Sequence, residues 1–156
     1  MLINLICVGN KMPGWVNEGY QEYAKRLNRD VRIKLVELEL AKRSKTSSVE
    51  NLKASEAKKI LQAIPKANQV VVLDVNGSQW STEKLSQRLT HWLQSGKDVS
   101  LIIGGPDGLE QSLVQAADER WSLSKLTFPH PLVRIVIAEQ IYRAWSLLNN
   151  HPYHRQ

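Results

Sequence analysis

The amino-acid sequence predicts an α/β fold in which a mainly parallel sheet is flanked by helices. Strand-like and helix-like segments alternate along all 156 residues, which is typical of strands joined by helical crossovers. Two strand-like segments, 70–75 (VVVLDV) and 99–103 (VSLII), are nearly continuous apolar runs, as in strands buried on both faces. The length suits one domain, 1–156, with a sizeable core. This pattern predicts no strand order.

The first half of the chain is expected to hold two strands and two helices before the apolar strand at 70–75. Residues 2–8 (LINLICV) form a short apolar strand, and a helix follows at 13–28. The strand at 31–40 alternates between apolar and polar residues and then changes phase, which indicates a bulge or an edge strand. The second helix, at 49–64, ends before a proline.

The second half continues the alternation. Ser81 is expected to cap a helix with a one-sided apolar face, and Gly96 is expected to end it. The later elements are predicted in this order: a strand at 99–103, a helix at 109–120, a fifth strand at 121–128, and a last helix with Pro131 in its first turn.

The last helix is apolar around most of its circumference. Its apolar residues are Leu132, Val133, Ile135, Val136, Ile137, Ala138, Ile141, Tyr142, Ala144, Trp145 and Leu148. A helix of this kind is buried on nearly all sides, and at the end of a small domain a partner subunit would cover its outer face. We therefore expect a homodimer with Ile137 and Ile141 at the interface. The alternative is a central core helix in a monomer.

Composition and charge favour a polyanionic partner. Lys and Arg number 21 against 15 Asp and Glu, a net charge of +6. Nucleic acid is the usual partner of so basic a domain, although a basic enzyme that binds none is an equal alternative. The single cysteine, Cys7, is expected in the core. No apolar run approaches the roughly 20 residues of a membrane span, and no signal peptide is evident, so we expect a cytoplasmic protein.

A glycine loop, residues 104–108 (GGPDG), follows the strand at 99–103. Ligands of open parallel sheets bind beyond the carboxyl ends of the strands, and glycines let a ligand approach the backbone closely. The spacing is neither G-x-G-x-x-G nor that of a P-loop, which argues against a dinucleotide and against a P-loop nucleotide. An ordinary strand-to-helix turn is the alternative.

The last helix also carries charges that need an explanation. Glu139 and Arg143 are spaced i, i+4 on a surface that is otherwise apolar. A charge on a buried helix is costly unless it is paired or functional, so we favour a role in a site over a helix-stabilising ion pair. Arg134 carries the same argument more weakly.

Two polar segments remain. The tail after the last helix contains Tyr153, His154 and Arg155, and it is either a disordered end or a segment that contacts substrate. The basic loop, residues 42–45 (KRSK), is either a solvated surface or a contact for phosphates, as are two arginines near the end of the first helix. With one cysteine and no H-x-x-x-H spacing, no metal site is predicted.

Four segments closely resemble one family: 9–16 (GNKMPGWV), 101–108 (LIIGGPDG), 121–146 (WSLSKLTFPHPLVRIVIAEQIYRAWS) and 150–155 (NHPYHR). They are similar to the SPOUT-class methyltransferases that methylate N3 of a pseudouridine in large-subunit (23S) ribosomal RNA. The resemblance covers essentially the whole chain. It implies a C-terminal trefoil knot, which no sequence rule would predict because knots are nearly absent from proteins.

The resemblance also implies a homodimer, S-adenosyl-L-methionine as cofactor, and ribosomal RNA in the assembled ribosome as substrate. The cofactor-binding residues that it implies are Leu73, Gly104, Gly105, Leu123, Ser124, Lys125, Leu126, Thr127 and Phe128.

The expected reaction is attack of the ring N3 on the sulfonium methyl group, without a metal or a covalent enzyme intermediate. Alignment and exclusion of water supply most of the catalysis. Arg143 is suited to stabilise an imide anion, and Tyr153 to stack on the base. Glu139 and His154 are alternative acceptors of the N3 proton. The candidate catalytic residues are thus Glu139, Arg143, Tyr153, His154 and Arg155.

Several questions stay open at this point. The sequence does not predict the general base, the rRNA position or a need for prior pseudouridylation. It also does not predict whether the tail acts in its own subunit or across the dimer. A ribosome-binding module without catalysis and a doubly wound enzyme for a small anionic metabolite are the alternative functions.

Overall fold

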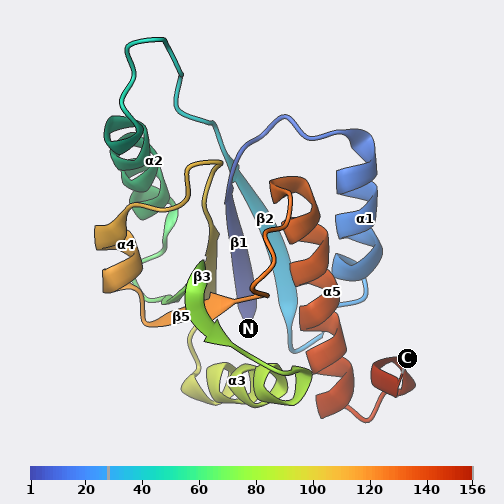
Figure 1. Ribbon diagram of the computed structural model, residues 1–156. Helices are drawn as coiled ribbons and strands as arrows, with labels where there is room; N and C mark the ends of the chain where they lie inside the picture. The colour runs from blue at the N-terminus through green and yellow to red at the C-terminus, as the bar shows by residue number, and fades with distance from the viewer. Residues whose placement is uncertain (28, 156) are drawn as a thin grey trace.

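A five-stranded parallel sheet forms the centre of the computed structural model, which describes residues 1–27 and 29–155 (Figure 1). Every neighbouring pair of strands is parallel, and their order across the sheet is β2-β1-β4-β3-β5. The strands are β1 (Leu2–Val8), β2 (Arg32–Leu38), β3 (Gln69–Gln79), β4 (Val99–Ile103) and β5 (Glu119–Ser122). The predicted α/β fold with a parallel sheet is confirmed.

Helices cover both faces of this sheet. Figure 1 shows α1 and α5 side by side on one face and α2 and α4 on the other. Neighbouring residues of β1 point to opposite faces: Leu5 packs with Trp92 and Ile141, whereas Ile6 packs with Ile60. The helices are α1 (Gly14–Ala24), α2 (Val49–Ala63), α3 (Thr82–Ser95), α4 (Gln111–Ala116), α5 (His130–Leu148) and a final 3₁₀ helix, η1 (Pro152–Arg155).

Several predicted boundaries rest on local signals that the structure confirms. The Ser81 hydroxyl accepts a hydrogen bond from the backbone N–H of Lys84 and caps α3. Gly96 ends that helix with a left-handed φ of 69°. Pro131 lies in the first turn of α5. β2 lies at the sheet edge and pairs with β1 in unbroken register, so the phase change in its sequence marks an edge and not a bulge.

Other boundaries were predicted wrongly. The first helix ends at Ala24, and its predicted end at Asn28, like Gln156 at the end of the predicted domain, lies outside the described residues. The helix predicted at 109–120 is only α4, because the backbone at Asp118 already pairs with Val70 and leads into β5.

The predicted fifth strand exists as β5, but its bounds are Glu119–Ser122 and not 121–128. β5 ends at Ser122, whose hydroxyl donates to the Ser124 carbonyl, while the Ser124 hydroxyl accepts from the Leu126 N–H. These local hydrogen bonds turn the chain out of the sheet.

α5 is buried mainly by its own subunit. Ile137 and Ile141 are fully buried against the sheet and neighbouring helices, so placing them at a dimer interface was wrong. The apolar residue of α5 most open to solvent is Leu132, which is 38% exposed, and Val136 on the same outer face is half-buried. Across 1–27 and 29–155, no helix is long and apolar enough to cross a membrane.

Candidate functional site

A pocket of about 900 Å³ opens at the carboxyl ends of β4 and β5 and beside the middle of β3, just beyond the residues of β3 that pair with β4. Its wall combines this middle part of β3, the glycine loop and the irregular segment 123–128 that follows β5. Because all strands are parallel, these three segments meet at one edge of the sheet, where ligands of this fold class bind.

The residues expected to bind a cofactor come together in this wall. Those that line it are Leu73, Gly104, Gly105, Leu123, Ser124, Leu126, Thr127 and Phe128. Lys125 differs: its side chain is exposed, and it is not among the lining residues that the structure describes.

The glycines of the loop serve the backbone more directly than they serve a ligand. Gly108 has a left-handed φ of 82°, and its N–H donates to the Gly105 carbonyl at 3.0 Å, which closes a tight turn. A Cβ atom on Gly105 would lie 3.0 Å from a carboxylate oxygen of Glu56 and 3.3 Å from Val8. Gly105 therefore leaves room for a neighbouring helix, which differs from the expectation that it makes room for a ligand.

Asp107 and His130 are among the polar residues of the wall that were not predicted as site residues. Asp107 lies in the glycine loop and forms a 2.5 Å ion pair with Arg43 of the basic loop. His130 begins α5, and burial, assisted by the Arg134 charge, lowers the pKa of its imidazole. Both could have been found from their place in the sequence, because Asp107 lies in segment 101–108 and His130 in segment 121–146, which carry the family resemblance.

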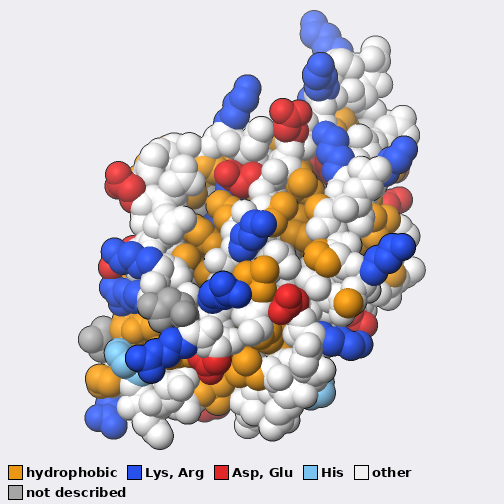
Figure 2. Space-filling view, turned by 180° about the vertical axis from the view of Figure 1, so that it is seen from behind, with side chains coloured by type: hydrophobic (Ala, Val, Ile, Leu, Met, Phe, Trp, Pro, Cys, Tyr) orange, Lys and Arg blue, Asp and Glu red, His pale blue; other side chains and the backbone are white. Residues whose placement is uncertain are grey.

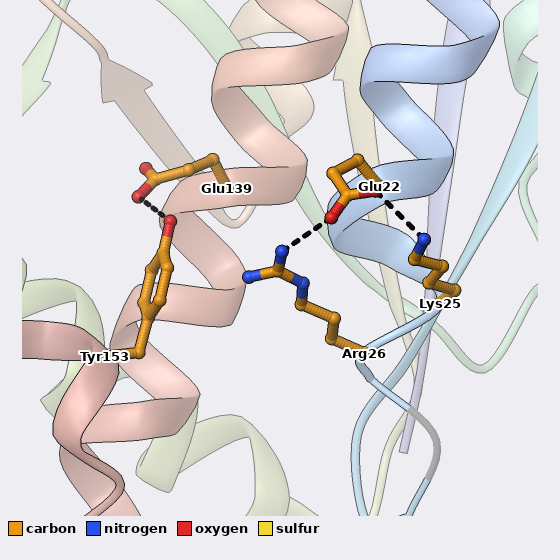
Figure 3. A network of polar contacts seen from close by, with 5 residues as sticks. All are labelled: Glu22, Lys25, Arg26, Glu139 and Tyr153. Carbon is orange, nitrogen blue, oxygen red and sulfur yellow. Dashed lines mark hydrogen bonds and ion pairs between the residues drawn. The ribbon is translucent and has the colours of Figure 1, made fainter.

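A second cluster of predicted residues, the outer cluster, consists of Glu139, Arg143 and Tyr153 and lies on the outer face of α5. Figure 3 shows Glu139 and Tyr153 of this cluster. Glu139 accepts hydrogen bonds from Arg143 Nε at 2.9 Å and from the Tyr153 hydroxyl at 3.0 Å. The Arg143 guanidinium lies 5.1 Å from the centre of the Tyr153 ring. Burial, followed by the hydrogen bond to Glu139, raises the pKa of Tyr153 to about 12. Three of the predicted catalytic residues are thus in direct contact.

The tail is ordered around this cluster. η1 folds back along α5, and the Tyr153 ring packs 4.6 Å from that of Tyr142. Arg26, paired with Glu22, lies 5.7 Å from the centre of the Tyr153 ring, so the segment after α1 also holds the tail (Figure 3). Of the two alternatives for the tail, the structure contradicts a disordered end.

The last two predicted catalytic residues follow on η1. Arg155 is exposed, whereas His154 is half-buried, and its Nδ1 is enclosed without a hydrogen-bond partner among the described residues. No described contact joins either side chain to Glu139.

Arg134 has a structural explanation. It is fully buried, pairs with Glu37 of β2 at 2.7 Å, and donates to the Gly9 carbonyl after β1. It thereby ties α5 to two strands, and we assign it no role in a site.

The pocket and the outer cluster are separate within one subunit. Among the described residues, the pocket wall contains none of the predicted catalytic residues. Glu139 follows His130 of the wall by nine positions, which places it about 13 Å along the helix and roughly half a turn around it. The cluster therefore faces away from the pocket of its own chain.

The basic residues spread over more than one surface. Figure 2 shows Lys and Arg side chains at the tip of the projecting segment between β2 and α2, and others at the opposite end of the molecule. Lys42, Arg43 and Lys45 of the basic loop are exposed. This arrangement leaves phosphate contacts open at both ends of the sheet.

Comparisons with known proteins agree on one family. A family model described as "Predicted SPOUT methyltransferase" matches residues 1–154. The chain is 60% identical over 156 residues to a protein of Hydrogenovibrio crunogenus named ribosomal RNA large subunit methyltransferase H, with both chains covered in full. A protein of the same name from Methylococcus capsulatus is 52% identical, covering 99% of this chain and 100% of that one.

Solved structures show likeness in fold. A probable methylase family protein from Haemophilus influenzae superposes with a TM-score of 0.59 at 11% identity, covering 96% of this chain and 69% of that one. A putative methylase family protein from Neisseria gonorrhoeae gives a TM-score of 0.53 at 14% identity, covering 90% and 81%.

Proposed function

The chain belongs to the SPOUT methyltransferase family, and from this premise we propose that it methylates N3 of a pseudouridine in 23S ribosomal RNA, with S-adenosyl-L-methionine as methyl donor. The names of the relatives support large-subunit rRNA as the substrate. Family membership also implies that the C-terminal third is threaded as a trefoil knot. The observation that carries the proposal is the pocket at the carboxyl ends of β4 and β5, beside the middle of β3.

The residues of the pocket fit such a cofactor. A volume of about 900 Å³ lies within the usual range for cofactor sites. Leu126 and Phe128 offer apolar contacts for an aromatic ring, and the backbone of the glycine loop offers polar groups. Asp74 is an acidic side chain of the wall, which suits a ligand with a cationic centre, whereas Arg43 already neutralises Asp107. When bound, the cofactor supplies an electrophilic methyl group.

The tail is proposed to act across a dimer. The outer cluster faces away from the pocket of its own chain, so a second copy is the route by which Tyr153 and its neighbours reach a pocket. Leu132 and Val136, on the same outer face, offer the apolar contact for that copy. In a two-fold dimer the same faces meet, and each pocket then receives groups from the partner.

The outer cluster suits the chemistry of a uracil-type base. The guanidinium of Arg143 stabilises the imide anion that forms as N3 loses its proton. Tyr153 is the aromatic residue of the cluster that is suited to stack on the base, in exchange for an arginine that contacts its ring within the subunit. Glu139 holds both groups in position. His154, whose Nδ1 has no partner among the described residues, is the candidate acceptor of the proton.

Calorimetric titration with S-adenosyl-L-methionine, followed by methyl transfer to ribosomes from a strain that lacks the modification, tests the proposal. We expect saturable binding and transfer to large-subunit rRNA. Ribosome binding without cofactor binding would support a non-catalytic module instead. Turnover of a small anionic metabolite without ribosomes would support the metabolic enzyme.

A further inference from the structure

A buried carboxylate without a hydrogen-bond partner lies directly behind the glycine loop. Glu56 of α2 is 3% exposed, and neither of its carboxylate oxygens has a hydrogen-bond partner among the described residues. It lies on the apolar face of the helix, four positions after Leu52 and four before Ile60. Buried polar groups are nearly always hydrogen-bonded, so this one calls for a functional explanation.

The carboxylate faces the backbone of the cofactor pocket. A Cβ atom on Gly105 would lie 3.0 and 3.2 Å from the two oxygens of Glu56. Gly105 itself lines the pocket. The absence of a side chain at Gly105 thus brings the carboxylate against the reverse side of the loop that forms the pocket wall.

A cation links the carboxylate to the same loop. Arg43 is ion-paired with Asp107 at 2.5 Å, and its charge also favours the ionised form of Glu56. Lys59 acts in the same direction, whereas Asp107 opposes it. Loss of hydration on burial outweighs these charges and raises the pKa of Glu56. Arg43 comes from the basic loop, so three separate segments converge behind the pocket.

We propose that Glu56 is a positioning residue for the cofactor: with Arg43 as its counter-ion, its carboxylate sets the conformation in which the glycine loop receives the ligand. The inference rests on the proposed function. Gly105, beside the carboxylate, and Asp107 have backbone N–H groups, whereas Pro106 between them has none. These N–H groups are the donors that Glu56 accepts from when the pocket is filled.

Positioning and structural roles differ in their effect on stability. Because the pKa of Glu56 is raised in the folded protein, the folded state binds this proton more tightly than the unfolded chain. Stability from this group is therefore present at low pH and declines as pH rises from the unfolded pKa through the folded one. Glu56→Gln removes the buried charge, so at pH 8 the variant should unfold at the same temperature or higher while it binds the cofactor more weakly.

The test measures the Kd for S-adenosyl-L-methionine by calorimetry on the full-length protein at pH 8, together with thermal unfolding. The variants are Glu56→Gln, Glu56→Met, Arg43→Ala and the Glu56→Gln/Arg43→Ala double variant. Glu50→Gln, an exposed acid on the same helix, is the matched control. We expect each single variant to raise Kd about tenfold or more, the loss typical of a charge-assisted hydrogen bond. The Kd of the double variant should stay within about twofold of the Kd of the single variant that binds less tightly, because the two residues act together.

Each result decides whether Glu56 positions the glycine loop for the cofactor or has a structural role alone. A Kd for Glu56→Gln and Glu56→Met within about twofold of the unaltered protein overturns the inference, as does weak binding accompanied by a lower unfolding temperature in both. If the unaltered protein binds cofactor and methylates rRNA, and these variants bind the cofactor equally well, the inference about Glu56 is overturned while the proposed function stands. An unaltered protein that binds no cofactor overturns the proposed function and this inference with it.

Discussion

Removal of the tail after Asn150 should reduce methyl transfer by about two orders of magnitude or more while the protein stays folded. The principal contacts that the cut deletes are the Tyr153 hydrogen bond to Glu139, the hydrogen bond from the His151 backbone N–H to the Ser146 carbonyl, the ring contact between Tyr153 and Tyr142, and two cation–π contacts. At about 1 kcal/mol for each hydrogen bond, about 1 for the ring pair and about 0.5–1 for each cation–π contact, the loss is roughly 4–5 kcal/mol. A domain is typically stable by about 5–15 kcal/mol, so we expect a fall in melting temperature of about 10 °C without unfolding at 25 °C.

Three measurements on the truncated protein test this expectation. Denaturant unfolding gives the free energy, calorimetry gives the affinity for S-adenosyl-L-methionine, and transfer of labelled methyl groups to ribosomes gives activity. Affinity should change little, because among the described residues no tail residue lines the pocket. Methyl transfer should fall by about two orders of magnitude or more, the size of a lost proton-transfer group. Full activity of the truncated homodimer would refute a role for the tail.

A mixed dimer tests whether the tail acts across subunits. One chain is truncated after Asn150, and the other carries Gly105→Val, whose side chain would collide with Glu56 behind the loop. If the tail serves the partner, one pocket of the mixed dimer has both an intact loop and an intact tail, and activity returns in part. An inactive mixture, with the heterodimer verified by mass, would place the tail in its own subunit.

Three further predictions concern packing. Leu132→Glu should give monomers by light scattering, because it charges the exposed apolar spot on α5, and an unchanged dimer would exclude this face. Ile137→Ala should cost about 2–5 kcal/mol in urea unfolding, because the side chain is fully buried in its own core, and a loss below about 1 kcal/mol would contradict that placement. Burial raises the pKa of Cys7 to about 12, so at pH 8 the thiol should resist iodoacetamide in the folded protein and react in urea, whereas equal rates would contradict its burial.

Local signals in the sequence predicted the elements that depend on them. The apolar run of β4 and the caps of α3 at Ser81 and Gly96 are set by neighbouring residues, and they were located correctly. The strand order depends on pairing between distant segments, which no local pattern encodes. The segment 123–128 failed for a different reason, because an apolar residue that faces a pocket cannot be distinguished by composition from one in a buried strand.

The candidate site shows the same division. Motif resemblance indicated the glycine loop and the segment after β5, and the structure brings both to one pocket. Glu139 is separated from that pocket because it points to the other side of α5 from His130, and the sequence motif does not predict which side of a helix faces a pocket. Glu56 carried a visible signal, since an acidic residue interrupts the apolar face of α2, but its contact with Gly105 joins segments far apart in the chain. The apolar circumference of α5 likewise led us to place Ile137 at a dimer interface, whereas the structure buries that side chain in the core of its own subunit.

The nucleoside that carries the transferred methyl group tests the proposed function most directly. Ribosomes that lack the modification are incubated with the protein and labelled S-adenosyl-L-methionine, and the rRNA of each subunit is then digested to nucleosides and resolved by mass spectrometry. The proposal requires label in large-subunit rRNA as N3-methylated pseudouridine, with none in small-subunit rRNA. Label in any other nucleoside, or no label in large-subunit rRNA despite cofactor binding, would contradict it.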